Sequence, residues 1–292
     1  MTLNDQAERL RRRIQQRDGE QYARTIAIAS GKGGVGKSNL TLNFALKLIE
    51  QNKRVIIFDL DIGMGNIDIL MGVSPSSSIV DLFKDESTIQ EIIEWGPNNL
   101  AYIAGGSGLA EIFKMDSKKF DYFKNQFEKL STSFDYILFD MGAGVTETTL
   151  HFLAAAHEVI IVTTPEPTSI TDGYAMMKHL IRYENDVPIA VIVNRTNQNK
   201  EGYQTFSRLR TVVHRFLEKD IAYLGMLPDD RDVLRAVNHQ SPFVLDSPNC
   251  RASEAMESIV THYLKGNSAL PSSFPSPSFL SKLKRYILTG NR

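Results

Sequence analysis

The stretch Ser30–Asn39 reads SGKGGVGKSN and carries two lysines, Lys32 and Lys37, in one glycine-rich loop. Residues 31–38 of this loop fit G-x-x-x-x-G-K-[ST], the pattern of a phosphate-binding loop. The apolar run Thr25–Ala29 directly before it predicts a strand, and the apolar spacing after it predicts a helix. A strand, this loop and a helix in that order predict an α/β nucleotide-binding fold.

Each residue type in the loop has a physical role. Glycines let backbone N–H groups close on phosphate oxygens, and the helix N-terminus adds a positive dipole. Lys37 would reach the β- and γ-phosphates of a nucleotide, and the Ser38 hydroxyl would bind Mg²⁺. The predicted nucleotide-binding set in this loop is Gly31, Gly33, Gly34, Val35, Gly36, Lys37, Ser38 and Asn39. The alternative is a glycine-rich turn without a ligand.

Carboxylates follow two further predicted strands. Asp140 ends the run at 136–139, and Asp59 and Asp61 lie in FDLDIGMGNIDIL at 58–70. Carboxylates at these places can bind Mg²⁺ directly or through water, or orient an attacking water. Ser38 and Asp140 are therefore candidates for the metal site, and Asp59 and Asp61 can each contact the metal or orient the water, while a plain strand and turn remains the alternative for 58–70.

Apolar, β-branched runs alternate with helix-like stretches along the chain. This order predicts a single P-loop NTPase domain of the α/β class, with a mostly parallel, doubly wound sheet of about seven to eight strands. Ligands of such sheets bind beyond the carboxyl ends of the strands, where the loop and the three aspartates fall. The expected strands are Thr25–Ala29, Arg54–Asp59, Leu100–Ala104, Tyr136–Asp140, Val159–Thr163, Ile189–Val193 and Ala222–Gly225.

Composition excludes several other classes. The 292 residues are 42% hydrophobic with a net charge of −1, which suits one large domain and argues against a protein that coats nucleic acid. The single cysteine excludes an intramolecular disulfide and a cysteine-only metal cluster within one chain. Apolar runs fall short of the about 20 residues that a membrane span requires, so we expect a cytoplasmic protein.

Short segments flank the predicted domain, which covers 21–265. An arginine-rich helix with one apolar stripe is predicted at 1–20, and a Ser/Pro-rich linker at 266–278. Residues 279–292 are predicted to form a second amphipathic helix, in which Lys282 and Lys284 flank the apolar face. Such a helix suits an anionic membrane surface, and two copies in a dimer would bind by avidity. Its apolar face consists of Phe279, Leu280, Leu283, Tyr286 and Ile287.

Two other interpretations of this C-terminal helix stay open. It can dock on its own domain or on a partner protein. It can also dock when the nucleotide site is empty and leave when the site is loaded.

The segment KGGVGKS resembles the deviant Walker A loop of the MinD/ParA class of P-loop ATPases, and DLDIGMGNIDILMG at 59–72 is similar to the MinD switch I segment. The resemblance runs from about Thr25 to Leu264. It implies ATP and ADP as ligands with Mg²⁺, and a homodimer that forms on ATP. In that family the lysine matched by Lys32 reaches the phosphates bound by the partner chain, and Asp172 is the expected partner of Lys32 without ATP.

The same resemblance assigns the remaining site residues. Lys32, Lys37 and Asp61 would act in a slow, switch-like ATP hydrolysis, while Asp59 and Asp140 would join Ser38 at the metal. Asn194, Pro228 and Asp229 match positions that recognise adenine. Two positions depart from the family pattern. Asn39 stands where many relatives have threonine, which replaces a hydroxyl by an amide near the α-phosphate, and Gly142 stands where MinD often has proline.

The segment DQAERLR at 5–11 resembles a motif that precedes the ATPase domain in the flagellar MinD-like family FlhG (YlxH). That resemblance implies a regulator of flagellar number or placement that stimulates the signal-recognition-type GTPase FlhF, with Gln6 at the partner's nucleotide site. Basal-body or C-ring proteins are further implied partners. A helix that only caps the domain is the alternative for this segment. The implied location is cytoplasmic, and peripheral on the inner face of the cell membrane in the ATP state.

A ParA-like role in partitioning DNA or cargo ranks second. Its basic face would consist of Lys200, Arg208, Arg210 and Arg215, which suit non-specific phosphate binding and equally a solvated helix. Iron–sulfur members of the class need two cysteines per chain, and Cys250 alone does not supply them.

Overall fold

Eight strands form one sheet within the part of the chain that the structure describes. The structure is a computed structural model that describes residues 22–61, 66–84, 87–106, 117–266 and 279–289. The strand order is β3-β4-β2-β5-β1-β6-β7-β8, and every pairing is parallel except that of β3 with β4. The strands are β1 (Arg24–Ala29), β2 (Val55–Leu60), β3 (Glu94–Trp95), β4 (Ala101–Ile103), β5 (Tyr136–Met141), β6 (Glu158–Thr163), β7 (Ile189–Thr196) and β8 (Ala222–Pro228).

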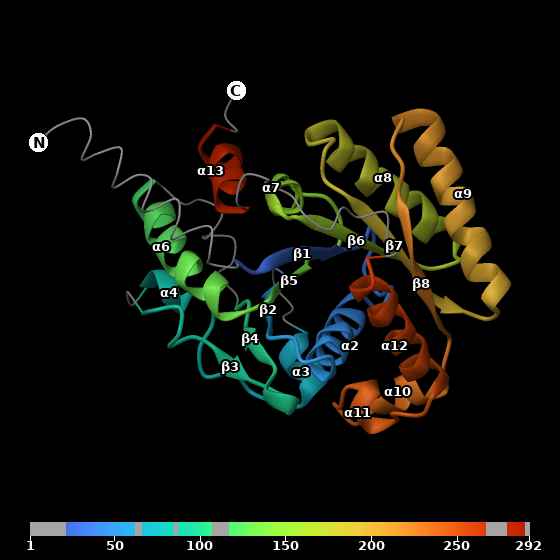
Figure 1. The fold of residues 1–292 in the computed structure, drawn as a ribbon, viewed down its shortest axis with the longest axis horizontal. Coiled ribbons are helices and arrows are strands. Elements are labelled where there is room, and N and C mark those ends of the chain that lie inside the picture. Colours follow the sequence, from blue (N-terminus) through green and yellow to red (C-terminus); the bar gives the residue numbers. More distant parts are fainter. Residues whose placement is uncertain (1–21, 62–65, 85–86, 107–116, 267–278, 290–292) are drawn as a thin grey trace, which may run out of the picture.

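Helices cover both faces of this sheet (Figure 1). One face packs against α2 (Lys37–Glu50), α3 (Ile67–Met71), α10 (Arg231–Asn238), α11 (Phe243–Asp246) and α12 (Arg251–Leu264). The other packs against α4 (Asp81–Lys84), α6 (Ser117–Ser133), α7 (Glu147–Ala155), α8 (Pro167–Tyr183), α9 (Asn199–Leu217) and α13 (Phe279–Thr289). A 3₁₀ turn, η1 (Pro97–Asn99), separates β3 from β4.

The central strands are buried on both faces, which explains their unbroken apolar sequences. In β1, Ile26 and Ile28 point to the α2 side of the sheet, and Ala27 and Ala29 point to the α7 side. The predicted doubly wound α/β fold is therefore confirmed. The seven predicted strands are all present, with ends that differ by at most three residues, and β3 is an eighth that the sequence pattern did not reveal.

The predicted segments at the two ends have different outcomes. Residues 1–20 and nearly all of the predicted linker lie outside the described residues. The C-terminal helix is present as α13, and its packing is described with the functional site below.

Candidate nucleotide site

Glycine is required at two places in the phosphate-binding loop. A Cβ on Gly31 would lie 2.1 Å from the backbone carbon of Asp172, so α8 packs directly on the start of the loop. Gly36 has a φ of 90°, in the left-handed region, and a Cβ there would lie 2.4 Å from Nδ2 of Asn194. These contacts hold the loop between β1 and α2 in one shape.

Lys37 is buried at the centre of the site. Its Nζ lies 2.8 Å from Oδ1 of Asp140 and 3.9 Å from Oδ2 of Asp61. Thr41, one turn further along α2, also donates to Asp140 Oδ1 at 2.9 Å. Three residues predicted from separate segments, Lys37, Asp61 and Asp140, thus lie together. Thr41 was not predicted, although its spacing of four from Lys37 places both on one helix face.

Asp59 organises the segment that follows β2. Its carboxylate accepts N–H groups from Asp61 at 3.1 Å, Asn66 at 2.9 Å and Ile67 at 3.3 Å. Burial, together with the nearby charge of Asp140, raises the pKa of Asp59 to about 7. Burial also raises the pKa of Asp61, against the opposing effect of Lys37. This edge of the sheet therefore carries an excess of buried acid, which a cation would offset.

The residues present fit a magnesium ion. Oδ2 of Asp140 is buried and accepts no hydrogen bond within the described part of the chain. Ser38 Oγ lies 3.2 Å from Lys37 Nζ, at the start of α2. A hydroxyl and carboxylates are the oxygen ligands that Mg²⁺ prefers. Ser38, Asp59 and Asp140 would hold the ion, which would neutralise phosphate charge.

A cavity of about 730 Å³ opens beside the loop. Among its walls are Gly36 and Asn39 from the loop side, and Asn194, Pro228 and Asp229 from the ends of β7 and β8. Asn194 donates to the carbonyl of Val35 at 2.8 Å, which fixes the side of the cavity next to the loop. The structure thus brings the predicted adenine residues to one cavity with the phosphate loop.

Lys32 has a different partner from the one expected. Its Nζ lies 2.5 Å from Glu166 Oε2 and 3.0 Å from Thr168 Oγ1. The expectation that Asp172 pairs with Lys32 was wrong, because the backbone of Asp172 packs under Gly31 while Glu166 precedes α8 at the level of the Lys32 side chain. The Lys32–Glu166 pair is exposed to solvent, so it contributes little to stability.

The other predicted loop residues surround this centre. Gly33 and Gly34 are exposed and Val35 is buried. Gly142 lies in the loop after β5, which approaches the phosphate loop where the Gly144 N–H donates to the carbonyl of Ser30 at 3.2 Å. Gln6 lies outside the described residues.

Comparison with known proteins agrees with this geometry. A model of the ParA family, described as "NUBPL iron-transfer P-loop NTPase", matches residues 21–264. The chain belongs to the ParA family of P-loop NTPases. Its members and neighbours are ATPases of the MinD/ParA type, and this protein is such an ATPase.

One relative of this ParA-family chain is a flagellar protein by name, and a second is named an antiactivator. The flagellum site-determining protein YlxH of Helicobacter pylori is 36% identical, with 92% of each chain covered. The antiactivator FleN of Pseudomonas aeruginosa is 32% identical, with 80% of this chain and 84% of FleN covered. Among solved structures, the septum site-determining protein MinD with Mg-ADP from Pyrococcus horikoshii OT3 has a TM-score of 0.68 at 23% identity, covering 84% of this chain and 98% of that one.

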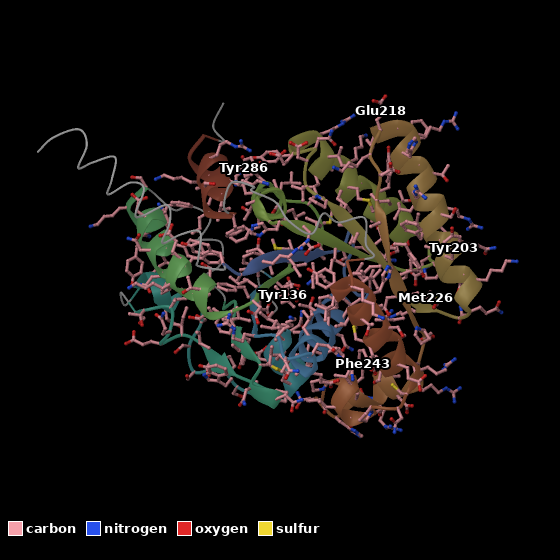
Figure 2. The ribbon with its side chains drawn as sticks, viewed as in Figure 1. Tyr136, Tyr203, Glu218, Met226, Phe243 and Tyr286 are labelled. Atoms are coloured by element: carbon pink, nitrogen blue, oxygen red, sulfur yellow. The ribbon has the colours of Figure 1, made fainter. Side chains whose placement is uncertain are left out.

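In this ParA-family chain the C-terminal helix is docked on its own domain. Phe279, Leu280, Leu283 and Tyr286 are buried against α6, α7 and β5. Figure 2 shows Tyr286 on α13 above α7. Tyr286 donates a hydrogen bond to Glu184, and Arg285 donates to the same carboxylate at 3.0 Å. None of the described helices is long and apolar enough to cross a membrane.

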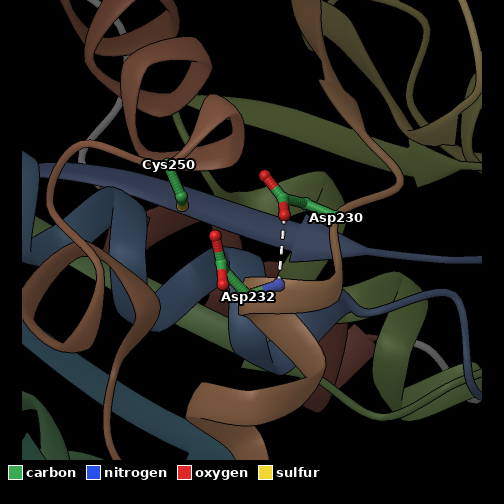
Figure 3. Close-up of side chains that lie close together, drawn as sticks. All are labelled: Asp230, Asp232 and Cys250. Carbon is green, nitrogen blue, oxygen red and sulfur yellow. Dashed lines mark hydrogen bonds between the residues drawn. The ribbon is translucent and has the colours of Figure 1, made fainter.

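Asp230, Asp232 and Cys250 lie close together (Figure 3), and Asp230 also borders the cavity. Asp230 caps α10 by accepting the N–H of Asp232 at 3.0 Å, and also accepts the N–H of Ala252 at 3.2 Å. Cys250 caps α12 through the N–H of Ser253. Helix capping therefore accounts for the contacts of Asp230 and Cys250, and the cluster joins the two helices that border the cavity on the side of Pro228 and Asp229.

Proposed function

We propose that this ATPase is a membrane-reversible switch that regulates flagellar number or placement. ATP would bring two copies together, with Lys32 of each chain reaching the phosphates held by the other. The dimer would attach to an anionic membrane through two copies of α13, while the segment 1–20 stimulates a signal-recognition-type GTPase. The observation that carries the proposal is the docking of a basic amphipathic helix on the strand that also bears Asp140.

The connection runs through neighbouring residues of β5. Phe139 faces α13, where its ring stacks on Phe279 with centroids 5.0 Å apart. Asp140 faces the opposite side of the sheet and holds Lys37. The loop after β5 leads directly into α7, on which α13 lies. A change at Asp140 on nucleotide binding therefore has a short path to the docked helix.

The docked state of α13 supports the interpretation in which this helix leaves the domain when ATP binds. Four of its apolar side chains are buried, which stabilises docking by roughly 1.5–3 kcal/mol each. The same side chains are those that a membrane would take up, so membrane binding and docking exclude each other. A docked helix would keep the empty protein off the membrane, and avidity would favour the membrane for a loaded dimer.

The name of YlxH supports the flagellar role, and the name of FleN supports a regulatory one. FleN is called an antiactivator and YlxH a flagellum site-determining protein, and both match most of this chain. Iron transfer, which appears in the family description, is not proposed, because the sequence has one cysteine and that residue caps α12.

The test is sedimentation with anionic vesicles or with DNA at matched salt, with ATP and with ADP. We expect the protein to bind vesicles only when ATP and Mg²⁺ are present, and to double its mass in solution under the same conditions. DNA binding with ATP, reduced steeply by salt, would support instead the partitioning role, for which α9 exposes Arg208, Arg210 and Arg215.

A further inference from the structure

Asn43 is fully buried in the middle of α2 and makes three hydrogen bonds. Its Nδ2 donates to the backbone carbonyl of Asn39 and to Oδ1 of Asn39, each at 2.7 Å. Its Oδ1 accepts the N–H of Val244 at 3.0 Å. Both polar atoms of the Asn43 side-chain amide are thus hydrogen-bonded, to Asn39 and to Val244, as is expected of a buried amide.

Two backbone groups fix the orientation of the Asn43 amide. The carbonyl of Asn39 only accepts, so the NH₂ group must face it, and the N–H of Val244 only donates, so the oxygen must face that side. A rotated amide would set donor against donor and acceptor against acceptor.

The fixed amide of Asn43 in turn orients the side chain of Asn39. Because the second N–H of Asn43 meets Oδ1 of Asn39, the Asn39 oxygen faces the interior of α2 and its own NH₂ group faces away. No hydrogen bond from that NH₂ group occurs within the described part of the chain. Asn39 borders the 730 Å³ cavity, so two N–H donors remain for a ligand there.

The place of Asn39 indicates which ligand atom these donors meet. Lys37 marks the end of the site where the terminal phosphates bind, and Asn194 marks the end where the base binds. Asn39 lies in the first turn of α2, between these two ends of the site. The anionic oxygen closest to the base is that of the α-phosphate, and charge-assisted N–H bonds to it are strong.

Val244 adds a second function to the same buried amide. Val244 lies in the first turn of α11, and its neighbour Phe243, labelled in Figure 2, lines the cavity. Pro242 before them has no N–H, and the N–H of Val244 has no acceptor within α11. Asn43 supplies that acceptor, so one side chain holds both the phosphate side and the α11 wall of the cavity.

We propose that Asn43 is a positioning residue that turns the side-chain donors of Asn39 toward the α-phosphate of the nucleotide. This inference rests on nucleotide binding in the cavity, and it is independent of dimerisation, membrane attachment and the flagellar role.

The experiment compares the Kd of ADP with Mg²⁺ by calorimetry for Asn39→Ala, Asn43→Asp and the double variant. Asn39→Ala removes the donors, and we expect affinity to fall roughly tenfold. Asn43→Asp still accepts from Val244 but repels the Asn39 oxygen, so the Asn39 amide rotates and presents oxygen to the phosphate. We expect a loss of roughly tenfold to a hundredfold. The double variant should bind ADP as Asn39→Ala alone does.

Asn125→Asp, which adds the same charge on the exposed face of α6, is the matched control and should bind ADP as the unchanged protein does. Losses that multiply in the double variant, or unchanged affinity of Asn43→Asp, would overturn the proposal. The unfolding temperature of each variant without ligand identifies a folding defect. If Asn43→Asp does not fold, Asn43→Leu replaces it, with the same comparison in the Asn39→Ala background. If the unchanged protein binds no ADP, the assignment of the nucleotide site is itself wrong. If the unchanged protein binds ADP and only the comparison of the variants fails, the proposed role of Asn43 alone is wrong.

Discussion

Phe279 of α13 stacks on Phe139 of β5 with ring centroids 5.0 Å apart, and Phe139 directly precedes Asp140, which holds the buried Lys37. Successive side chains of a strand point to opposite faces, so one short strand contacts both the nucleotide site and the C-terminal helix. In the proposed switch, a change at Asp140 would reach the docked α13 through this strand.

A change in the groove, which leaves the helix itself unaltered, tests the docking. Glu184 accepts hydrogen bonds from Arg285 and Tyr286, so Glu184→Lys sets a cation against Arg285. We expect binding to anionic vesicles without ATP to rise several-fold, because the docked state is weakened while the membrane face is intact. Sedimentation with vesicles measures this. Glu257→Lys on the exposed side of α12 adds the same charge and should have no such effect. If both variants bind vesicles equally well, the added positive charge explains the binding and the docking of α13 does not.

Lys32→Ala tests the role of Lys32 across the dimer. Lys32 contacts Glu166 and Thr168 in the single chain, and of these two partners Glu166 also borders the cavity, where it is exposed. We expect ATP binding within a few-fold of the unchanged protein and loss of the ATP-dependent dimer in sedimentation velocity. Lys118→Ala on α6 is the control and should still dimerise. A Lys32→Ala protein that doubles its mass with ATP would remove the trans role.

Gly31→Ala tests the contact between the loop and α8. The added Cβ would lie 2.1 Å from the carbonyl carbon of Asp172 and 2.6 Å from the nitrogen of Gly173, and backbone atoms cannot move aside easily. We expect the free energy of unfolding to fall by about 2–3 kcal/mol or more in chemical denaturation. Gly33→Ala is the control for stability, because its nearest neighbour is 3.9 Å away. Equal stability of both variants would show that α8 does not pack on Gly31.

Acid should destabilise the fold through His157. Burial, and then the charges of Arg24 and Lys282, lower its pKa to about 4, and its Nδ1 accepts the N–H of Thr25 at 3.0 Å. The unfolded chain binds the proton near pH 6.5 and the folded chain does so near pH 4, so stability is present above pH 6.5 and is lost as the pH falls between these values. The loss amounts to about 3 kcal/mol at most. Chemical denaturation from pH 7 to 4 measures it.

The variant His157→Gln should show a flatter dependence on pH over that range. His214→Gln, on the exposed side of α9, should keep the slope of the unchanged protein. If His157→Gln keeps that slope too, other groups cause the loss in acid.

A peptide of residues 1–20 tests the N-terminal segment apart from the ATPase domain. We expect the peptide to accelerate GTP hydrolysis by the flagellar signal-recognition-type GTPase, and a peptide with Gln6→Ala to lose most of that effect, since a neutral amide orients an attacking water. Phosphate release measures both. If the two peptides stimulate GTP hydrolysis equally, Gln6 has no role in the stimulation.

Much of the site could be predicted because short patterns determine it. The loop sequence places Lys37 and Ser38 at the start of α2, and the parallel register brings Asp59 and Asp140 side by side at the same edge of the sheet. Glu166 could not be predicted as the partner of Lys32, because their distance depends on how α8 packs against Gly31. The strand β3 was missed because Glu94–Trp95 is too short to show a period.

The C-terminal helix shows a different limit of sequence patterns. An apolar stripe predicts that one face of a helix is covered, but the covering surface can be a lipid bilayer or a protein groove. The aromatic rings of Phe127, Phe139 and Phe152 around Phe279 decide for the groove in this structure.

The position of β1 has a consequence for the synthesis of the protein. This strand lies between β5 and β6, so its two neighbours are made more than a hundred residues after it. During translation the phosphate loop emerges early but has no sheet to hold it until residues up to Thr163 have left the ribosome. A nascent chain shorter than this should not retain nucleotide, and because such long-range pairing is slow, the switch becomes operational only late in its own production.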